Sequence, residues 1–474
     1  MRLRTGSPAN RRIVFALTST GMFLVSLDVS IANVTLPAMS KSFPGSGRAA
    51  LSWVICAYAI AFAAALVPGG RLADRAGRRI VFLSGFALFA VGSLICGLAP
   101  SLPVAIGGRI VQGVGAAAGQ PASLGLLLAA AGSERRAQTA ARWGGTGAIG
   151  IALGPVLGGA ITTALGWRWA YLVNLPVVAI VACMAPAYLA ETARHPGRRL
   201  PDPVGAVMLA AGAALLTLGI SEGPTWGWSS WRTAVAVAAG VLATAVFVHR
   251  CRRVPDPLLD LRLLGRRSFA LVTVVTVFYS AAFFGLLFSF VLFLTDVWRL
   301  SLVDCGLAIA PMALVVVILS MRVGGLSERV GFRLPLRSGA VLICAGLLLD
   351  AAVLGDPRML LFPWLPVVML IGLGIGLCYP LLSAAAVSEM PTGELASATA
   401  VNQCARQLGA ALGVAAAVAA LGAATPAPVA DFHLAWLVGA GFALIAALAA
   451  AALPSGRRRR ADERLRADLD RAMT

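Results

Sequence analysis

The chain repeats one pattern along most of its length, an apolar run of about 20 residues that is closed by Pro, Gly or a charged residue. A helix needs about 20 mostly apolar residues to cross the hydrocarbon core of a bilayer. We predict fourteen such helices, at residues 13–37, 51–70, 80–99, 104–130, 143–164, 170–190, 204–220, 233–249, 269–294, 306–323, 338–355, 360–384, 396–423 and 434–453. The expected fold class is an all-α membrane protein.

The composition excludes most soluble classes. Hydrophobic residues make up 59% of the chain and charged residues only 12%, with a mean hydropathy of +0.86. Lys and Arg exceed Asp and Glu by 39 to 20. A nucleic-acid binder would gather such an excess on one solvated face, but here the basic residues lie in short segments between apolar runs. We therefore expect membrane lipids and no nucleic acid as partners.

The distribution of basic residues predicts the orientation. Of the 39 Lys and Arg residues, 31 lie in tails and loops on the side that holds both termini, two (Arg109 and Arg406) lie inside predicted helices, and six lie on the other side: Lys41, Arg48, Arg168, Arg232, Arg299 and Arg358. Because cytoplasmic loops are enriched in Lys and Arg, both termini are expected in the cytoplasm. Thirteen or fifteen helices would scatter the Arg-rich loops to both sides.

The first apolar run predicts an uncleaved helix rather than a signal peptide, since it is long and contains Asp28 and Asn33. The eight cysteines and three histidines are scattered without metal-ligand or redox spacing. No nucleophile-elbow or phosphate-loop pattern occurs either. We expect no enzyme activity, no metal and no cofactor.

Two charged stretches, residues 70–79 and 324–333, indicate an internal repeat. An offset of 254 residues pairs glycines and charges of the same sign: Gly70 with Gly324, Asp74 with Glu328, Arg75 with Arg329, Gly77 with Gly331 and Arg79 with Arg333. A second set, Gly113, Gly115 and Pro121, matches Gly372, Gly374 and Pro380 at an offset of 259. Repeated halves around a central site are typical of secondary transporters.

The repeat predicts a domain organisation of two six-helix bundles with a helix pair inserted between them. The first bundle is expected at residues 1–190, the linkers and central pair at 191–267, the second bundle at 268–453 and a basic cytoplasmic tail at 454–474. The tail is expected to lie against anionic lipid.

Six stretches, in order along the chain, resemble the major facilitator superfamily and, within it, the 14-helix drug:proton antiporters. The stretch "GRLADRAGRRI" (70–80) resembles the superfamily's loop between helices 2 and 3, "RIVQGVGAA" (109–117) its helix-4 motif and "GAIGIALGPVLGG" (147–159) the helix-5 antiporter motif. Three other stretches resemble elements of the drug-exporter branch: "LDVSIANVTLP" (27–37), "WVICAY" (53–58) and "WRWAYLVNLP" (167–176).

The resemblance implies roles for two of these motifs. The first loop would gate the cytoplasmic side through Gly70, Asp74, Arg75, Gly77, Arg78 and, from the second half, Glu328 and Arg329. The alternative is that this basic loop only determines the orientation of the protein in the membrane and has no gating role. The helix-5 motif would support export by antiport through Gly147, Gly150, Gly154, Pro155, Gly158 and Gly159. Glycines at intervals of four equally permit close helix packing alone.

Charges inside the apolar helices are the strongest functional signal, because an intramembrane ion is costly and faces protein or a cavity. Asp28 lies nine residues before Pro37 and Arg109 six after Pro103, which puts them roughly 13 and 9 Å below the same outer surface. We predict that Asp28 carries the transported proton and that Arg109 tunes it. The alternative is a purely structural ion pair.

Other polar and aromatic residues are candidates for a substrate cavity. Asn33 and Gln112 lie near Asp28 and Arg109, Asn402 and Arg406 share a helix face, and Tyr279 and Phe283 belong to an aromatic-rich helix whose other rings are expected to face lipid or pack in the core. The Asn402 and Arg406 pair could instead form a second cytoplasmic gate. Asp350 is expected to be an interfacial carboxylate rather than a second proton site, with Glu222 and Asp296 at outer helix ends.

The predicted function is a monomeric exporter in the inner membrane that exchanges protons inward for an apolar or amphipathic small molecule, such as a drug or antibiotic. The proton gradient drives it without a cofactor. A proton-coupled uptake symporter would share the buried Asp28. A membrane sensor that transports nothing would need no such carboxylate.

Overall fold

The computed structural model describes residues 8–131, 136–192, 202–355, 359–391 and 394–454. Within these residues all regular structure is helical, and fourteen helices are long and apolar enough to cross a membrane. The predicted fold class and number of spans are confirmed. The predicted domain boundaries at 190, 267 and 453 stay predictions.

The first bundle contains six spans, the last of which is interrupted at Val173. In chain order they are α1 (Pro8–Ser42), α2 (Arg48–Ala76), α3 (Arg78–Gly97), α4 (Leu102–Ala130), α5 (Arg136–Leu165), and α6 (Trp167–Leu172) with α7 (Asn174–Tyr188). The inserted pair consists of α8 (Pro203–Ser221), the short α9 (Gly223–Trp226) and α10 (Trp231–Arg253).

The second bundle follows the 3₁₀ turn η2 (Leu261–Gly265). It comprises α11 (Arg267–Asp296), α12 (Leu302–Val330), α13 (Arg333–Val353), a broken span, α16 (Leu395–Leu421) and α17 (Val429–Ala451). The broken span contains the π-helical turn η3 (Leu360–Trp364), α14 (Leu365–Cys378) and α15 (Leu381–Val387). The helix stops between α14 and α15 at Tyr379 and Pro380, because proline supplies no N–H to continue it.

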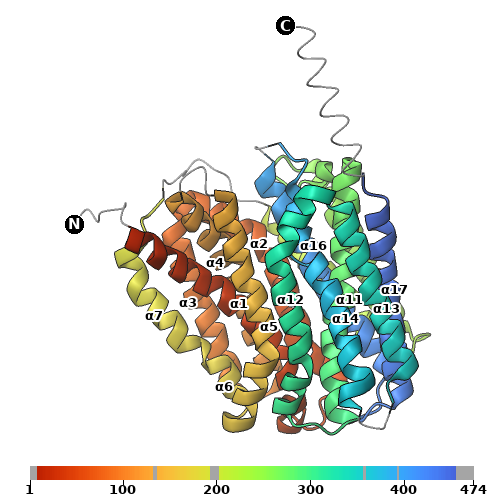
Figure 1. The fold of residues 1–474 in the computed structure, drawn as a ribbon. Helices are drawn as coiled ribbons and strands as arrows, with labels where there is room; N and C mark the ends of the chain where they lie inside the picture. The colour runs from red at the N-terminus through yellow and green to blue at the C-terminus, as the bar shows by residue number, and fades with distance from the viewer. Residues whose placement is uncertain (1–7, 132–135, 193–201, 356–358, 392–393, 455–474) are drawn as a thin grey trace.

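The two bundles stand side by side and meet along two seams (Figure 1). Helix α5 packs against α12 in one seam, and α2 packs against α16 in the other. In the inserted pair, α8 packs against α10 and also against both α2 and α16. The inserted pair therefore covers the second seam and contacts both bundles.

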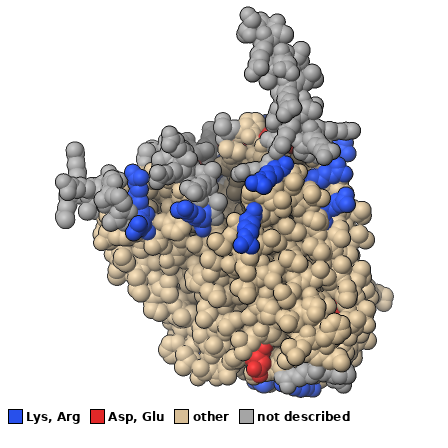
Figure 2. Space-filling view, in the orientation of Figure 1, with Lys and Arg blue, Asp and Glu red and all other residues tan. Residues whose placement is uncertain are grey.

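We call the end of the molecule where α1 begins and α17 ends the terminal face, and the other end the opposite face. Figure 2 shows Lys and Arg side chains gathered near the terminal face, above a broad band of other residues. Apolar side chains such as Val207, Leu242 and Met321 are more than 50% exposed in the helices. This surface fits a bilayer rather than water.

The charged stretch at residues 70–79 is mostly helical, which corrects the predicted loop. Helix α2 continues to Ala76 and α3 starts at Arg78, so only Gly77 separates them, at φ +109°. In the second bundle α12 ends at Val330 and Gly331 takes φ +79°. Only glycine adopts such a backbone readily, so the equivalent corners of the repeat turn by the same device.

Candidate functional site

The central feature of the first bundle is a buried ion pair between Asp28 of α1 and Arg109 of α4. The Arg109 Nη1 atom donates to a carboxylate oxygen of Asp28, and the side chains of both residues are 1% exposed. The sequence predicted only that the two could meet at similar depth. The structure brings them into direct contact.

Further donors surround the Asp28 carboxylate. Gln112 Nε2 and Asn174 Nδ2 donate to Asp28 Oδ1 at 3.1 and 3.0 Å. The same two amides donate to Ser93 Oγ at 2.7 and 3.1 Å. Helices α1, α3 and α7 each contribute one side chain to this closed polar network, and α4 contributes both Arg109 and Gln112. A fully connected network is what makes a buried charge tolerable.

The guanidinium of Arg109 is held from several directions. Its Nε atom donates to the main-chain oxygen of Val54 at 2.8 Å and Nη1 also donates to Gln112 Oε1 at 2.9 Å. Its central carbon lies 4.3 Å from the ring centre of Tyr58 and 5.8 Å from that of Tyr171. An arginine enclosed in this way has its charge balanced by Asp28 and its Nε and Nη1 donors occupied.

Sequence reasoning missed Ser93, Asn174, Tyr58 and Tyr171 as parts of this site. The only signal for Asn174 and Tyr171 was their place in the stretch 167–176, and for Tyr58 its place in 53–58. Asn33, which was predicted for the cavity, is buried in α1, but its amide donates only to Val29 of its own helix and its oxygen has no donor. Asn33 does not join the Asp28 network.

A second polar cluster lies in the other bundle. Asn402 Nδ2 donates to Thr276 Oγ1 at 2.7 Å, and Arg406 Nη2 donates to Ser383 Oγ at 2.9 Å. The Arg406 guanidinium lies 4.6 Å from the ring centre of Tyr379. The structure therefore brings Asn402 and Arg406 to the region where α11, α14, α15 and α16 meet.

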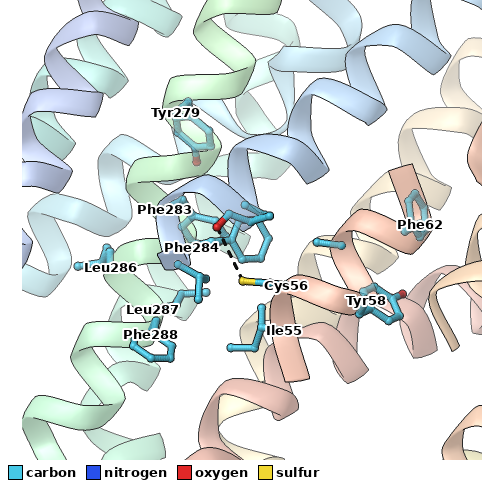
Figure 3. Packing of buried hydrophobic residues seen from close by; sticks show 14 of the residues in the cluster. Ile55, Cys56, Tyr58, Phe62, Tyr279, Phe283, Phe284, Leu286, Leu287 and Phe288 are labelled. Carbon is cyan, nitrogen blue, oxygen red and sulfur yellow. Dashed lines mark hydrogen bonds between the residues drawn. The ribbon is translucent and has the colours of Figure 1, made fainter. Parts of the chain in front are cut away.

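The aromatic helix α11 lies inside the protein, and most of its other rings pack in the core, one of the two positions expected for them. Phe284, Phe288, Phe290 and Phe293 are all buried. Tyr279 and Phe283 stack with ring centres 6.3 Å apart, and both rings lie near Tyr379. Figure 3 shows Tyr279, Phe283, Phe284 and Phe288 of α11 across from Ile55, Cys56 and Phe62 of α2.

The glycines of the helix-5 motif lie on two faces of α5. A Cβ added at Gly150 would lie 2.6 Å from the Phe23 main-chain oxygen, and one at Gly154 would overlap Ser30 Cβ. Gly147 and Gly158 face the same helix, against the end of the Met22 side chain and, less tightly, Ile31. These glycines let α5 approach α1, and their role in antiport stays a prediction.

Pro155 and Gly159 belong to the seam between the bundles. A Cβ at Gly306 of α12 would lie 2.6 Å from the Pro155 main-chain oxygen, and one at Gly159 would meet the main-chain oxygen of Leu302. Proline also leaves the carbonyl of Ile151 without its helical donor, and Ser30 Oγ donates to that oxygen at 2.9 Å. Helix α5 therefore continues through Pro155 with its polar groups satisfied.

Arg48 connects the two bundles at the opposite face. It begins α2, is only 7% exposed, and donates to the main-chain oxygens of Leu421, Gly422 and Ala424 at 2.8 Å each. These oxygens lie at the carboxyl end of α16, where unpaired carbonyls attract a cation. Sequence analysis had counted Arg48 only as a loop charge.

Weaker sulfur contacts follow the same seam toward the terminal face. Cys56 Sγ lies 3.8 Å from the Ala411 main-chain oxygen (Figure 3), and Cys404 Sγ lies 3.2 Å from that of Ala63. The described polar contacts between the bundles thus run from the opposite face to the middle of α2.

At the terminal face, the charged corner makes its described contacts within the first bundle and the linker. Asp74 pairs with Arg78 at 3.2 Å, and Arg78 also donates to the Gly125 main-chain oxygen at 3.0 Å. Glu191 accepts from the main-chain nitrogens of Arg79 and Ile80 at the start of α3, a favourable position for a carboxylate.

Other residues predicted for the gate are less constrained or lie outside the described part. Arg75 is exposed, and a Cβ at Gly70 would meet open space, so α2 does not need glycine there. Arg71 pairs with Asp256 of the linker at 3.6 Å. The side chain of Glu328 and the basic tail after Pro454 lie outside the described residues, and Arg329 lies near the end of α12.

The remaining acidic candidates occupy different environments. Asp350 is 0% exposed and its carboxylate oxygens have no hydrogen-bond donor among the described residues, so the expected interfacial position is wrong. Helices α14 and α17 pack on α13 and cover it. Asp296 and Glu222 are half-buried at the opposite face, and burial raises the pKa of the Glu222 carboxyl.

Comparisons with known proteins agree with this architecture. The family model described as Major Facilitator Superfamily matches residues 18–414. The multidrug resistance protein Stp of Mycobacterium tuberculosis is 34% identical over 424 residues, 87% of this chain and 77% of that protein. The cephamycin export protein CmcT of Amycolatopsis lactamdurans is 34% identical over 95% of this chain and 94% of its own length. The lincomycin resistance protein of Streptomyces lincolnensis is 32% identical over 86% and 83%.

Solved structures agree on the fold. A POT family transporter in complex with a thioalcohol-conjugated peptide superimposes with a TM-score of 0.69 at 14% identity, covering 92% of this chain and 95% of that one. An auto-inhibited POT family peptide transporter gives a TM-score of 0.66 at 17% identity, with 94% and 96% covered. The chain therefore belongs to the Major Facilitator Superfamily, a family of transporters rather than enzymes, and within it to the fourteen-helix drug and antibiotic efflux proteins.

Proposed function

We propose that the protein exports amphipathic small molecules across the cytoplasmic membrane in exchange for protons, by alternating access between its two bundles. We further infer that the terminal face lies in the cytoplasm. The concentration of Lys and Arg near that face supports this orientation. The relatives, which include a multidrug resistance protein and a cephamycin export protein, support drugs or antibiotics as the substrate class.

The single observation that carries the proposal is the Asp28 carboxylate, buried in the bundle and joined to Arg109, Gln112 and Asn174. A carboxylate in a closed network of donors changes its proton affinity when a movement of helices alters any one of those contacts. Because α1, α4 and α7 each contribute to the network, their rearrangement during transport would couple proton release to the conformational change.

The contacts between the bundles support alternating access. Arg48 holds α16 at the opposite face, and α5 and α12 touch backbone to backbone at Gly159 and Gly306 near the same end. An exporter must break these contacts to release its substrate outward. In this proposal the corner formed by Asp74, Arg78 and Gly77 acts on the cytoplasmic side, where it holds α2, α3 and α4 together.

The test measures proton movement in inside-out vesicles that hold an imposed pH gradient. Ethidium, 2-naphthamide and other amphipathic compounds are added to vesicles containing wild type, Asp28→Asn or Asp350→Asn protein. We expect compounds to dissipate the gradient with wild type and with Asp350→Asn, which changes a buried carboxylate of the other bundle, but not with Asp28→Asn. One proton moving down 100 mV supplies about 2.3 kcal/mol to the exchange.

Equal responses from wild type and Asp28→Asn would contradict the role of Asp28. Loss of the response in Asp350→Asn alone would move the proton site to the second bundle. Uptake of the compound together with protons, followed with labelled compound in right-side-out vesicles, would favour a symporter over an exporter.

A further inference from the structure

Arg406 is the only charged residue of α16, a helix of 27 residues long enough to cross the membrane. A cation at such a position is expected to face a partner or a cavity, because an isolated charge is poorly tolerated in hydrocarbon. Arg109, the other arginine predicted inside a helix, meets this expectation with the Asp28 carboxylate.

The described surroundings of Arg406 contain no such partner. No Asp or Glu oxygen among the described residues lies within 4.0 Å of its guanidinium, and the only side-chain acceptor is Ser383 Oγ at 2.9 Å. The Nε atom is buried without any acceptor. Because a guanidinium has five N–H donors in one plane, most of its hydrogen-bonding capacity is unused.

One face of the guanidinium rests on the ring of Tyr379 at 4.6 Å. This contact orients the guanidinium and occupies one of its two faces rather than its N–H donors. Two further rings, Tyr279 and Phe283, lie 6.4 and 5.9 Å from Tyr379 and are buried behind it. One turn before Arg406, the oxygen of the buried Asn402 amide also lacks a donor.

The cluster around Arg406 is more exposed than the Asp28 network. Arg406, Tyr379 and Ser383 are each partly exposed, whereas Asp28 and Arg109 have exposures of 2% and 1%. The break between α14 and α15, at Tyr379 and Pro380, puts Tyr379 and Ser383 on the two sides of an interruption in the span. Interrupted helices in transporters commonly line binding sites.

We propose that Arg406, Ser383 and Tyr379 form an anion-binding subsite that takes the carboxylate of an aromatic substrate. The guanidinium pairs with the carboxylate through two parallel hydrogen bonds, and the aromatic part of the substrate lies against Tyr379, the partly exposed ring of the cluster. The proposal rests on the transport function proposed above and adds aromatic carboxylates to its substrate class.

The test measures binding to purified full-length protein in detergent, through the increase in its thermal unfolding temperature with ligand concentration. The probes are 2-naphthoate, the uncharged 2-naphthamide of nearly the same shape, and inorganic phosphate. We expect Arg406→Gln to weaken 2-naphthoate binding about ten- to hundredfold, as for loss of a charged hydrogen bond, and to leave 2-naphthamide binding unchanged. Arg406→Lys is expected to retain part of the affinity.

Two further variants serve as controls. Arg322→Gln removes an exposed arginine of α12 and the same unit of charge, and it should bind 2-naphthoate like wild type. Ser383→Ala removes only the neighbouring hydroxyl and should weaken binding less than Arg406→Gln. If Arg406→Gln fails to fold, the binding of 2-naphthoate to Ser383→Ala still tests the subsite.

The proposal is overturned if wild type gains no stability from 2-naphthoate, if Arg406→Gln binds it equally well, or if phosphate gives the same Arg406-dependent stabilisation, which would indicate a simple inorganic anion or lipid phosphate site. The proton-flux assay distinguishes failure of the subsite proposal from failure of the transport proposal. Flux driven by ethidium or 2-naphthamide with no Arg406-dependent binding refutes the subsite alone. Arg406-dependent binding without flux for any compound refutes the transport function.

Discussion

Arg109 and Arg406 are the two arginines predicted inside membrane helices, one in each bundle, and their surroundings differ sharply. Arg109 is buried, paired with Asp28 and enclosed by Gln112, Val54 and Tyr58. Arg406 is partly exposed, rests on Tyr379 and donates to a single hydroxyl. The first bundle thus balances its charge internally, while the second leaves a charge that a ligand could balance. In the functions proposed above, the first arginine belongs to the proton site and the second to the substrate site.

The largest effect is expected from Arg109→Gln. This change leaves the Asp28 carboxylate buried without its cation, and stranding one member of a buried pair costs about 3–5 kcal/mol of folding free energy. Thermal unfolding of the purified protein in detergent measures the loss. The double variant Asp28→Asn with Arg109→Gln should recover much of it, because no charge is then stranded. An equal loss in the single and double variants would mean that the pair contributes little through its charges.

Asn174→Ala should cost about 1–3 kcal/mol, because it leaves a buried carboxylate and a buried hydroxyl each without one donor. Asn33→Ala is the matched control. Its amide is equally buried but donates only within its own helix, so its removal should cost less. The same unfolding measurement compares the two, and a larger effect for Asn33→Ala would contradict the network described around Asp28.

A third arginine, Arg250, provides an ion pair outside the apolar part of the molecule with which the other two arginines can be compared. It pairs with Asp202, and hydrogen bonding by Arg250 lowers the pKa of that carboxyl below its ordinary value of 3.8. A carboxyl with a lowered pKa stabilises the fold above its ordinary pKa and loses this contribution as the pH falls through its lowered value. Asp202→Asn should therefore unfold at a lower temperature than wild type at pH 7, by less than Asn174→Ala.

The pH dependence of the difference in unfolding temperature between Asp202→Asn and wild type tests whether the charge pair is responsible. The difference between Asp202→Asn and wild type should narrow as the pH falls below about 3.8, the ordinary pKa of the carboxyl. A difference that stays constant from pH 7 to pH 3 would show that the asparagine disturbs packing rather than the charge pair.

The smallest effect on stability is expected from Arg406→Gln. No carboxylate depends on this arginine in the described structure, so its replacement strands no opposite charge, and the unfolding free energy should change by no more than about 1 kcal/mol. Unfolding in the absence of ligand measures this. A loss as large as that of Arg109→Gln would show that an anionic partner already compensates Arg406.

Much of the fold follows from the sequence because it depends on local physics. The apolar runs are long enough to be counted, and Gly77 and Gly331 mark corners that only glycine makes easily. The sequence also predicted that Asp28 and Arg109 lie at similar depth, with Pro37 and Pro103 taken as helix ends, and the two residues do meet although α1 continues past Pro37 to Ser42.

The sequence alone does not indicate which helices pack over which residues. Asp350 looked interfacial because it lies close to the end of its helix, but α14 and α17 bury it. The rings of α11 looked evenly distributed, yet the surrounding helices enclose nearly all of them. Asn174 and Ser93 were missed as parts of the Asp28 site, because the partners of Asn174 lie 81 and 146 positions away in the sequence.

The contact that Arg48 makes at the opposite face has a consequence for how the transporter responds to acidity. Its three acceptors are main-chain carbonyls, which take up no proton in the biological pH range, and a guanidinium stays charged throughout that range. Acidification of the medium on that side therefore leaves the donors and acceptors of this closure unchanged. In the exporter proposed above, an acidic exterior would therefore strengthen the driving proton gradient without protonating a donor or an acceptor of this closure.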